Sequence, residues 1–376
     1  MAKQKKRGYI FVIFMLFIVY FLLAARPVPR ETILVPGWIS PLESGSSAAL
    51  DKNLHVSKQL FPFTLGSRFG YVSSDGEFAI NKIINNNIYL GENIWTEFSA
   101  EPSSIEINNI SGEPLIKIDN IRGYPVLLDN RIFILGSEQN SLSEINATGN
   151  ILWTYEFGAP LTCIDAAAGL VLTGSLDGMI EILDSGGKRI YYFEPGGSRY
   201  SIIYGCAISG NGSRLGIICG IDSQRFLLLE RLGNNGGEYR IIYHEFLESG
   251  FRRPVRVSFI DEDRRIVFER EGGIGCYNIK SRRSTYIPLD GKITAIDDSG
   301  DQSLLFLITS HPHQNNTLIG IKLPQDTSFS FLGTDAQEAV FLRASFKSSD
   351  IYLGRTGPML IAGGGTTLIS FNLEDK

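Results

Sequence analysis

Seven arginines stand close together in a chain whose formal net charge is −5. Guanidinium groups bind carboxylates and phosphates, so this concentration predicts a surface that attracts an acidic partner protein, a polyanionic wall polymer or lipid headgroups. The seven are Arg252, Arg253, Arg256, Arg264, Arg265, Arg282 and Arg283. The alternative is that they lie at separate strand ends, neutralised by the acids of the same segment. Those acids are Asp261, Glu262, Asp263, Glu269 and Glu271.

Two glycine turns in LTGSLDGMIEILDSGGKRI, residues 172–190, raise the question of a phosphate-binding loop. Such a loop requires the pattern GxxxxGK[ST], whose backbone N–H groups surround the phosphates. Gly187 and Lys188 fit, but Ile182 replaces the first glycine and Arg189 replaces the hydroxyl residue. The turns are therefore predicted to be hairpin corners.

Metal-binding patterns are weak. Asp297, Ser299 and Asp301 alternate as in a calcium loop, but no Glu closes the loop, so a solvated turn is expected. His311 and His313 flank a proline in a polar loop, where exposed histidines without a ligand are expected. We predict no metal and no cofactor.

The four cysteines, Cys163, Cys206, Cys219 and Cys276, lack zinc-type spacing and stand in apolar, strand-like surroundings. Buried free thiols are expected. A bridge between Cys206 and Cys219 remains open if adjacent strands place them opposite each other.

Nucleophilic catalysis lacks a readable site. The chain has no GxSxG motif, and none of its four histidines stands beside a Ser or Cys in a recognisable pattern. The acidic balance also opposes nucleic-acid binding, which depends on clustered cations. We therefore predict a non-catalytic protein.

The N-terminus predicts a membrane anchor. A basic tail, residues 1–7, precedes the uncharged run GYIFVIFMLFIVYFLLAA at 8–25, which is long enough to cross a bilayer as a helix. The positive-inside rule then places the C-terminal domain outside the cytoplasm, periplasmic in a diderm bacterium. A cleaved signal peptide is the alternative, although Leu22 and Leu23 occupy the positions where cleavage sites require small residues.

Residues 26–60 are rich in proline, serine and alanine and are predicted to be a linker. From residue 61 to 376, short apolar alternations separated by glycine turns repeat. The clearest copies begin at Arg131 and Gly169, and weaker ones follow at spacings typical of four-stranded propeller blades.

The repeats also resemble known families. GSLDGMIEILDSGGKRI is similar to a WD-repeat core, in which Ser175 and Asp177 match the hydroxyl and turn aspartate, although Leu183 replaces the Trp of the WD pair. SLSEINATGNILWTYEFGAPL resembles the repeat of quinoprotein-type propellers, a group that includes outer-membrane assembly lipoproteins. The resemblance implies a diverged β-propeller.

The sequence therefore predicts an all-β fold: a single propeller of about seven four-stranded blades, preceded by a transmembrane helix and a linker. We expect the segment 67–83 to pair with the C-terminal GTTLISFNL and close the ring. The expected function is a scaffold at the cytoplasmic membrane that binds other envelope proteins through its loops. The alternative is a propeller enzyme, a quinoprotein-like oxidoreductase or a hydrolase, with its site in the central channel.

Overall fold

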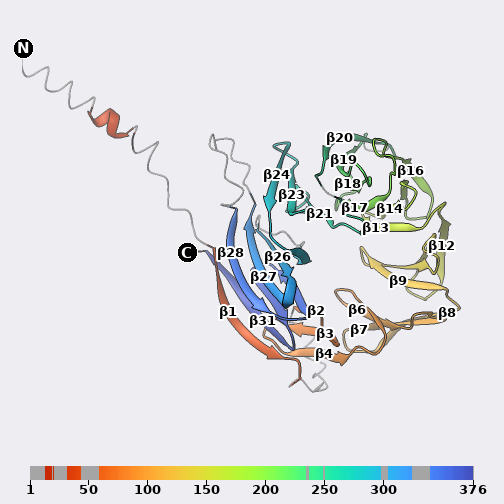
Figure 1. Cartoon of the computed structure of the whole chain (residues 1–376). Helices are drawn as coiled ribbons and strands as arrows, with labels where there is room; N and C mark the ends of the chain where they lie inside the picture. The colour runs from red at the N-terminus through yellow and green to blue at the C-terminus, as the bar shows by residue number, and fades with distance from the viewer. Residues whose placement is uncertain are drawn as a thin grey trace, which may run out of the picture.

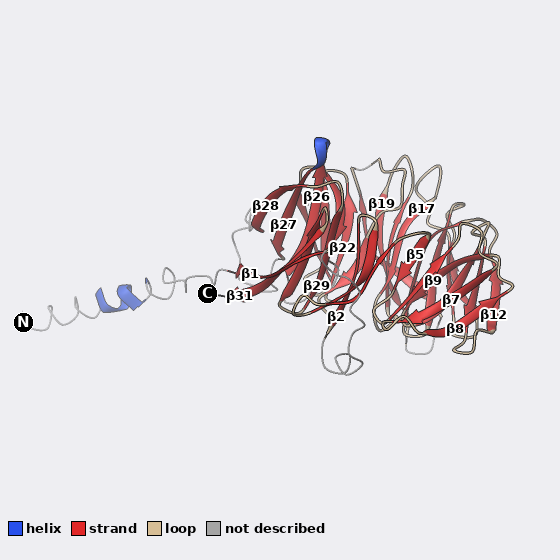
Figure 2. Cartoon of the chain, turned by 90° about the horizontal axis from the view of Figure 1, so that it is seen from below, coloured by secondary structure: helices blue, strands red, loops and turns tan. Residues whose placement is uncertain are grey.

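A computed structural model describes residues 13–18, 20, 32–43, 59–233, 237–248, 250–297, 304–323 and 339–375. These residues form antiparallel sheets that follow one another around a common centre in chain order (Figure 1). Strands make up the body, and the 3-10 turn η3 (Pro312–Gln314) projects at one edge (Figure 2). The fold is an all-β propeller, as predicted.

Each sheet is one blade. Blade 1 has three described strands: β2 (Leu60–Leu65), β3 (Arg68–Ser73) and β4 (Phe78–Ile83). Blade 2 consists of β5 (Asn87–Leu90), β6 (Ile94–Phe98), β7 (Ser104–Asn109) and β8 (Pro114–Asp119). Blade 3 consists of β9 (Gly123–Leu128), β10 (Arg131–Gly136), β11 (Ser141–Ile145) and β12 (Ile151–Glu156). Blade 4 consists of β13 (Leu161–Ala167), β14 (Leu170–Ser175), β15 (Ile180–Leu183) and β16 (Arg189–Phe193).

The second half continues in the same order. Blade 5 consists of β17 (Ile203–Ile208), β18 (Arg214–Cys219), β19 (Arg225–Arg231) and β20 (Tyr239–Phe246). Blade 6 consists of β21 (Val257–Ile260), β22 (Arg265–Arg270), β23 (Gly273–Asn278) and β24 (Arg283–Pro288). Blade 7 consists of β25 (Lys292–Ile296), β26 (Leu304–His311), β27 (Asn315–Lys322) and β28 (Val340–Lys347). Blade 8 consists of β29 (Ile351–Thr356), β30 (Met359–Gly364), β31 (Thr367–Asp375) and, from the N-terminal side, β1 (Thr32–Pro41).

The core lies between the blades. Successive residues of a strand point to opposite faces, so Leu172 packs with Ile217 of blade 5 while Val171 packs with Phe133 of blade 3. Each cluster of buried side chains in the described residues joins one blade to its neighbour, and together the clusters complete the circle. A blade is therefore apolar on both faces, and each face is buried only by the neighbouring blade on that side.

The predicted number of about seven blades is wrong, because the structure has eight. The estimate assumed an even period, but the innermost strands are unevenly spaced. They begin at 60, 87, 123, 161, 203, 257, 292 and 351. The short first blade and the blade completed from the N-terminal side do not repeat the pattern of the clear copies.

The ring is also closed by a different strand from the one predicted. Residues 67–83 contain all of β3 and β4, whereas β31 pairs antiparallel with β1, from Thr32 opposite Asp375 to Pro41 opposite Thr367. The closing strand thus comes from residues 26–60, where the sequence suggests a linker. The linker was inferred partly from the prolines of this segment. Proline is nevertheless tolerated in an outermost strand, because such a strand has no further strand to bond.

Strand β1 also ties blade 8 to blade 1. A register shift between Pro36 and Ile39 brings the Trp38 N–H to the Ser370 hydroxyl, at 2.9 Å. The Trp38 indole donates to the Ser74 carbonyl at 2.9 Å, and the Ser40 hydroxyl donates to the Gly76 carbonyl at 2.7 Å. These bonds join the first described strand to two blades.

The predicted anchor is described only at residues 13–18 and 20. No helix in the described part of the chain combines the length and the apolar character needed to cross a bilayer.

The glycine turns of residues 172–190 are hairpin corners, as predicted. Gly178 has φ +92°, and the Ser175 hydroxyl both bonds to Asp177 and accepts the Met179 N–H at 3.0 Å. In the next corner the Asp184 carboxylate accepts the backbone N–H of Lys188 at 2.9 Å. The polar groups of both corners are used locally.

Closure through β1 can be tested at Gly37, where an added Cβ would overlap the buried Ser370 hydroxyl. We expect Gly37→Ala to lower the free energy of unfolding by about 1–3 kcal/mol, because the clash disturbs the β1–β31 pair. Gly158→Ala is the matched control, since nothing lies within 4 Å of the added atom. Thermal or denaturant unfolding measures the difference, and equal stability of the two variants would contradict this role of β1.

Candidate functional site

The seven arginines belong to blade 6 and the loop before it, but they divide between its two ends. Arg256 precedes β21, and its carbonyl accepts the Glu269 N–H at 2.9 Å. At the opposite end, Arg265 lies opposite Asn278, which in turn lies opposite Arg283. Arg252 and Arg253 lie at the same end of blade 6 as Arg256, and Arg264 and Arg282 lie at the same end as Arg265 and Arg283. They do not form one continuous patch.

Two of the arginines support a corner. Asp261 is buried, and its carboxylate receives Arg264 at 2.6 Å and also Arg265 at very short range. Asp261, Glu262 and Asp263 all have positive φ, between 53° and 61°, a conformation that side chains disfavour. The ion pairs hold this β21–β22 corner, so the role of Arg264 and Arg265 here is structural.

Arg253 is held by a bidentate pair. Its guanidinium contacts the buried Glu269 carboxylate at 2.5 and 3.0 Å and lies 4.2 Å from the centre of the Phe251 ring. The hydrogen bond to Glu269, opposed by desolvation, raises the pKa of Arg253. Arg253 therefore neutralises an interior acid.

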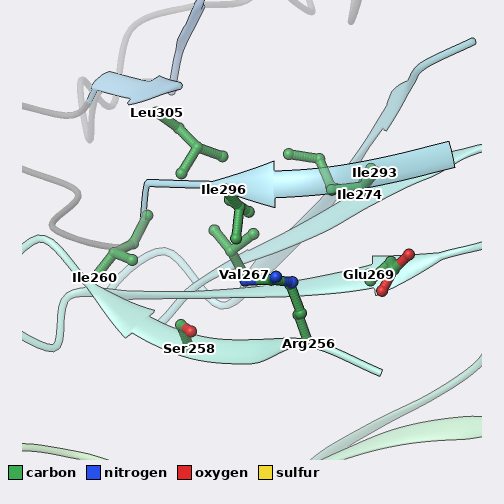
Figure 3. A pocket seen from close by; sticks show the side chains of 9 residues that line it. All are labelled: Arg256, Ser258, Ile260, Val267, Glu269, Ile274, Ile293, Ile296 and Leu305. Atoms are coloured by element: carbon green, nitrogen blue, oxygen red, sulfur yellow. The ribbon is translucent and has the colours of Figure 1, made fainter. Parts of the chain in front are cut away.

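The side chains of Arg252, Arg256, Arg282 and Arg283 are exposed. Arg256 also borders a small cavity between blades 6 and 7, where aliphatic side chains from the two blades face each other and Glu269 lies to one side (Figure 3). Its volume of about 10 Å³ leaves space for no more than about one water molecule. This cavity is a packing gap and offers no ligand site.

A larger polar hollow of about 420 Å³ lies where β13, β17 and β21 meet the central channel. Asp165 and Asp263 are its acidic residues. The Asp165 carboxylate accepts the N–H groups of Ala166 at 2.9 Å and Ile208 at 2.8 Å, so it joins blades 4 and 5. Within the described residues, no group of three His, Cys, Asp or Glu side chains is arranged to hold a metal.

One end of blades 4, 5 and 6 forms a continuous surface that we call the connector face. It contains the described residues of the segments that lead into each blade and of the turns between second and third strands: 157–160, 194–202, 247–248, 250–256, 176–179, 220–224 and 271–272. Hydrogen bonds connect these pieces, including Leu176 N–H to Pro160 at 2.9 Å, Ile221 N–H to Tyr200 at 3.2 Å and the Gln224 amide to Phe251 at 3.2 Å.

Large exposed side chains gather on the connector face. Leu176 is 49% exposed and Tyr200 is 54% exposed, and the Arg199 guanidinium lies 5.6 Å from the centre of the Tyr200 ring. Arg252 and Arg256 belong to the same face. Sequence reasoning missed Leu176, Arg199 and Tyr200, because they stand in separate turns that only the circular arrangement brings together. The single available signal was a large side chain two or three residues from a turn glycine.

Substitution can distinguish the structural from the exposed arginines. Arg253→Ala leaves the buried Glu269 carboxylate without its bidentate partner, so we expect a loss of about 1–3 kcal/mol in unfolding free energy. This lies below the range for fully buried pairs because the Arg253 side chain is 34% exposed. Arg252→Ala, the control, should change stability by less than about 0.5 kcal/mol. Chemical denaturation measures both, and equal values would contradict the assignment.

Comparison with known proteins agrees with the architecture. An uncharacterized protein of Treponema pallidum (strain Nichols) is 26% identical over 302 residues, 79% of each chain. BamB from Moraxella catarrhalis has a similar crystal structure, with a TM-score of 0.55 at 11% identity over 90% of this chain and 100% of that one. The computationally designed Ika8 protein gives a TM-score of 0.57 at 13% identity over 84% and 96%. These two structures are similar in fold alone.

A family model described as "beta-propeller protein" matches residues 1–360. Because this match spans most of the chain, the chain belongs to that β-propeller protein family.

Proposed function

We propose that this protein is a non-catalytic scaffold that binds another protein of the cell envelope through its connector face. Residues 8–25 hold it at the cytoplasmic membrane, and the propeller lies on the extracytoplasmic side. The observation that carries the proposal is the set of exposed large side chains on one end of three consecutive blades: Leu176, Arg199, Tyr200, Arg252 and Arg256.

Tyrosine and arginine are enriched in protein interfaces, because each combines a large contact area with hydrogen-bond donors. The connector face presents them on short segments fixed by backbone hydrogen bonds, so little ordering entropy is lost when a partner binds. The arginines favour a partner with acidic side chains opposite them.

The charge contribution is tested with Arg252→Glu together with Arg256→Glu. We expect crosslinking to the partner in membranes to fall several-fold, because acidic groups would then face each other. Arg253 is left unchanged, since its loss would disturb the interior pair with Glu269.

The matched control reverses Arg282 and Arg283, exposed arginines of the same blade at its opposite end. The control should crosslink at the wild-type yield, and both variants should keep the wild-type melting temperature. Wild-type crosslinking should also weaken with salt. Equal yields from the two double variants would remove the connector face as the contact surface.

The contribution of the aromatic side chain is tested with Tyr200→Ala. An interface tyrosine typically contributes about 1–2 kcal/mol, so we expect affinity for the crosslinked partner to fall about 10-fold or more. Tyr192→Ala is the control, because Tyr192 is 62% exposed on the outermost strand β16, outside the connector face. A titration with the purified partner measures both, and unchanged affinity of Tyr200→Ala would oppose the proposal.

Membrane topology is tested separately with intact spheroplasts. Externally added protease should cleave the propeller at the exposed connector 194–202 and leave the N-terminal basic tail protected. A propeller that is protected until the membrane is permeabilised would contradict an extracytoplasmic location.

A further inference from the structure

Two cysteines of neighbouring blades lie at one buried cluster between those blades. Cys163 lies on β13, the innermost strand of blade 4, and Cys206 lies on β17, the innermost strand of blade 5. Cys163 packs against the buried cluster between these two blades that includes Cys206, and its side chain is the largest cause of the raised pKa of the Cys206 thiol. Cys163 is half-buried, whereas Cys206 is 8% exposed and borders the polar hollow of the channel.

The relative position of the two strands is fixed on both sides of this pair. The Thr162 hydroxyl donates to the Ile203 carbonyl at 2.6 Å, and the Asp165 carboxylate accepts the Ile208 N–H at 2.8 Å. Cys163 lies between Thr162 and Asp165, and Cys206 lies between Ile203 and Ile208. Hydrogen bonds between two side chains of β13 and the backbone of β17 therefore hold together the two strands that carry the cysteines.

The other cysteines lack such an arrangement. Cys206 is opposite Ile217 in the β17–β18 pair, and Cys219 is opposite Ile203. The bridge between Cys206 and Cys219 that the sequence left open would need strands that place them opposite each other, which this register does not provide. Cys276 is buried in blade 6.

We propose that Cys163 and Cys206 form a disulfide that links the innermost strands of blades 4 and 5. The bond would covalently join two of the three blades that form the connector face. The inference rests on the positions of the thiols and is independent of partner binding. The extracytoplasmic location proposed above would supply the oxidising surroundings in which such bonds persist.

The reaction balances with a small disulfide such as oxidised glutathione as the oxidant. The Cys163 thiol loses its proton, and its sulfur attacks one sulfur of the oxidant, which releases one glutathione thiol and leaves a mixed disulfide. The Cys206 thiol then loses its proton and its sulfur attacks the Cys163 sulfur, which releases the second glutathione. Two protein thiols are oxidised and one glutathione disulfide is reduced. The Cys163 side chain is the largest cause of the raised pKa of the Cys206 thiol, and burial is the second. Burial persists when Cys163 carries glutathione, so the second step is expected to be the slower one.

The test uses the full chain, purified in detergent, reduced and then incubated with oxidised glutathione. Digestion with trypsin separates Cys163 from Cys206, because Lys188, Arg189 and Arg199 lie between them. We expect mass spectrometry to find the two peptides joined and two thiols per chain still free. The melting temperature should rise by roughly 5 °C, because the bond restricts the unfolded chain.

Cys163→Ser should abolish both the joined peptides and the temperature shift. The double variant Cys219→Ala with Cys276→Ala should retain both, which controls for the buried thiols elsewhere. Four free thiols after oxidation, glutathione retained on Cys163, or a bond between any other pair would overturn the proposal.

Discussion

The fold depends on closure of the ring by the pairing of β1 with β31. Every blade has two apolar faces, and each face is covered only by the next blade, so an open ring would expose one complete face at each end. The buried contacts between blades 8 and 1 join Ile361 and Leu368 to the first strands of blade 1. Strand β1 adds to this closure, because it completes blade 8 and bonds to blade 1 through Trp38 and Ser40. The contacts involved join residues at opposite ends of the chain, so their formation is entropically costly and is offset by burial between the last and first blades.

Local turn chemistry makes this closed arrangement repeatable. In several blades a short polar side chain accepts backbone N–H groups at the hairpin corner, as Ser175 and Asp184 do in blade 4 and Asn146 does in blade 3. Blade 6 solves the same problem with charge: three consecutive residues of positive φ are held by a buried aspartate and two arginines. Three of the seven arginines that stand out in the sequence, Arg253, Arg264 and Arg265, are thus used in ion pairs of the fold, and the other four are exposed.

The circular arrangement also creates sites that no single blade contains. The connector face gathers exposed side chains from three blades, and the buried cluster between blades 4 and 5 brings together cysteines from the innermost strands of both. In both cases the residues stand on segments whose backbone positions are fixed by hydrogen bonds, which makes their relative geometry reproducible without any local sequence motif. For the connector face this agrees with a general tendency, because binding residues often stand on loops positioned by a rigid scaffold.

The sequence alone determined the β-propeller, because alternating apolar residues and glycine corners such as Asp177-Gly178 are local signals with a local physical cause. It also identified the corners as structural and not as a phosphate loop. Tertiary structure decided the number of blades, the closing strand, the division of Arg252 and Arg253 from Arg282 and Arg283, and the packing of Cys163 against the cluster that contains Cys206. The physical reason is the same in each case. The alternation of side chains along a strand tells which face of the strand each side chain occupies. It does not tell which distant strand covers that face, or at which end of a blade a turn lies.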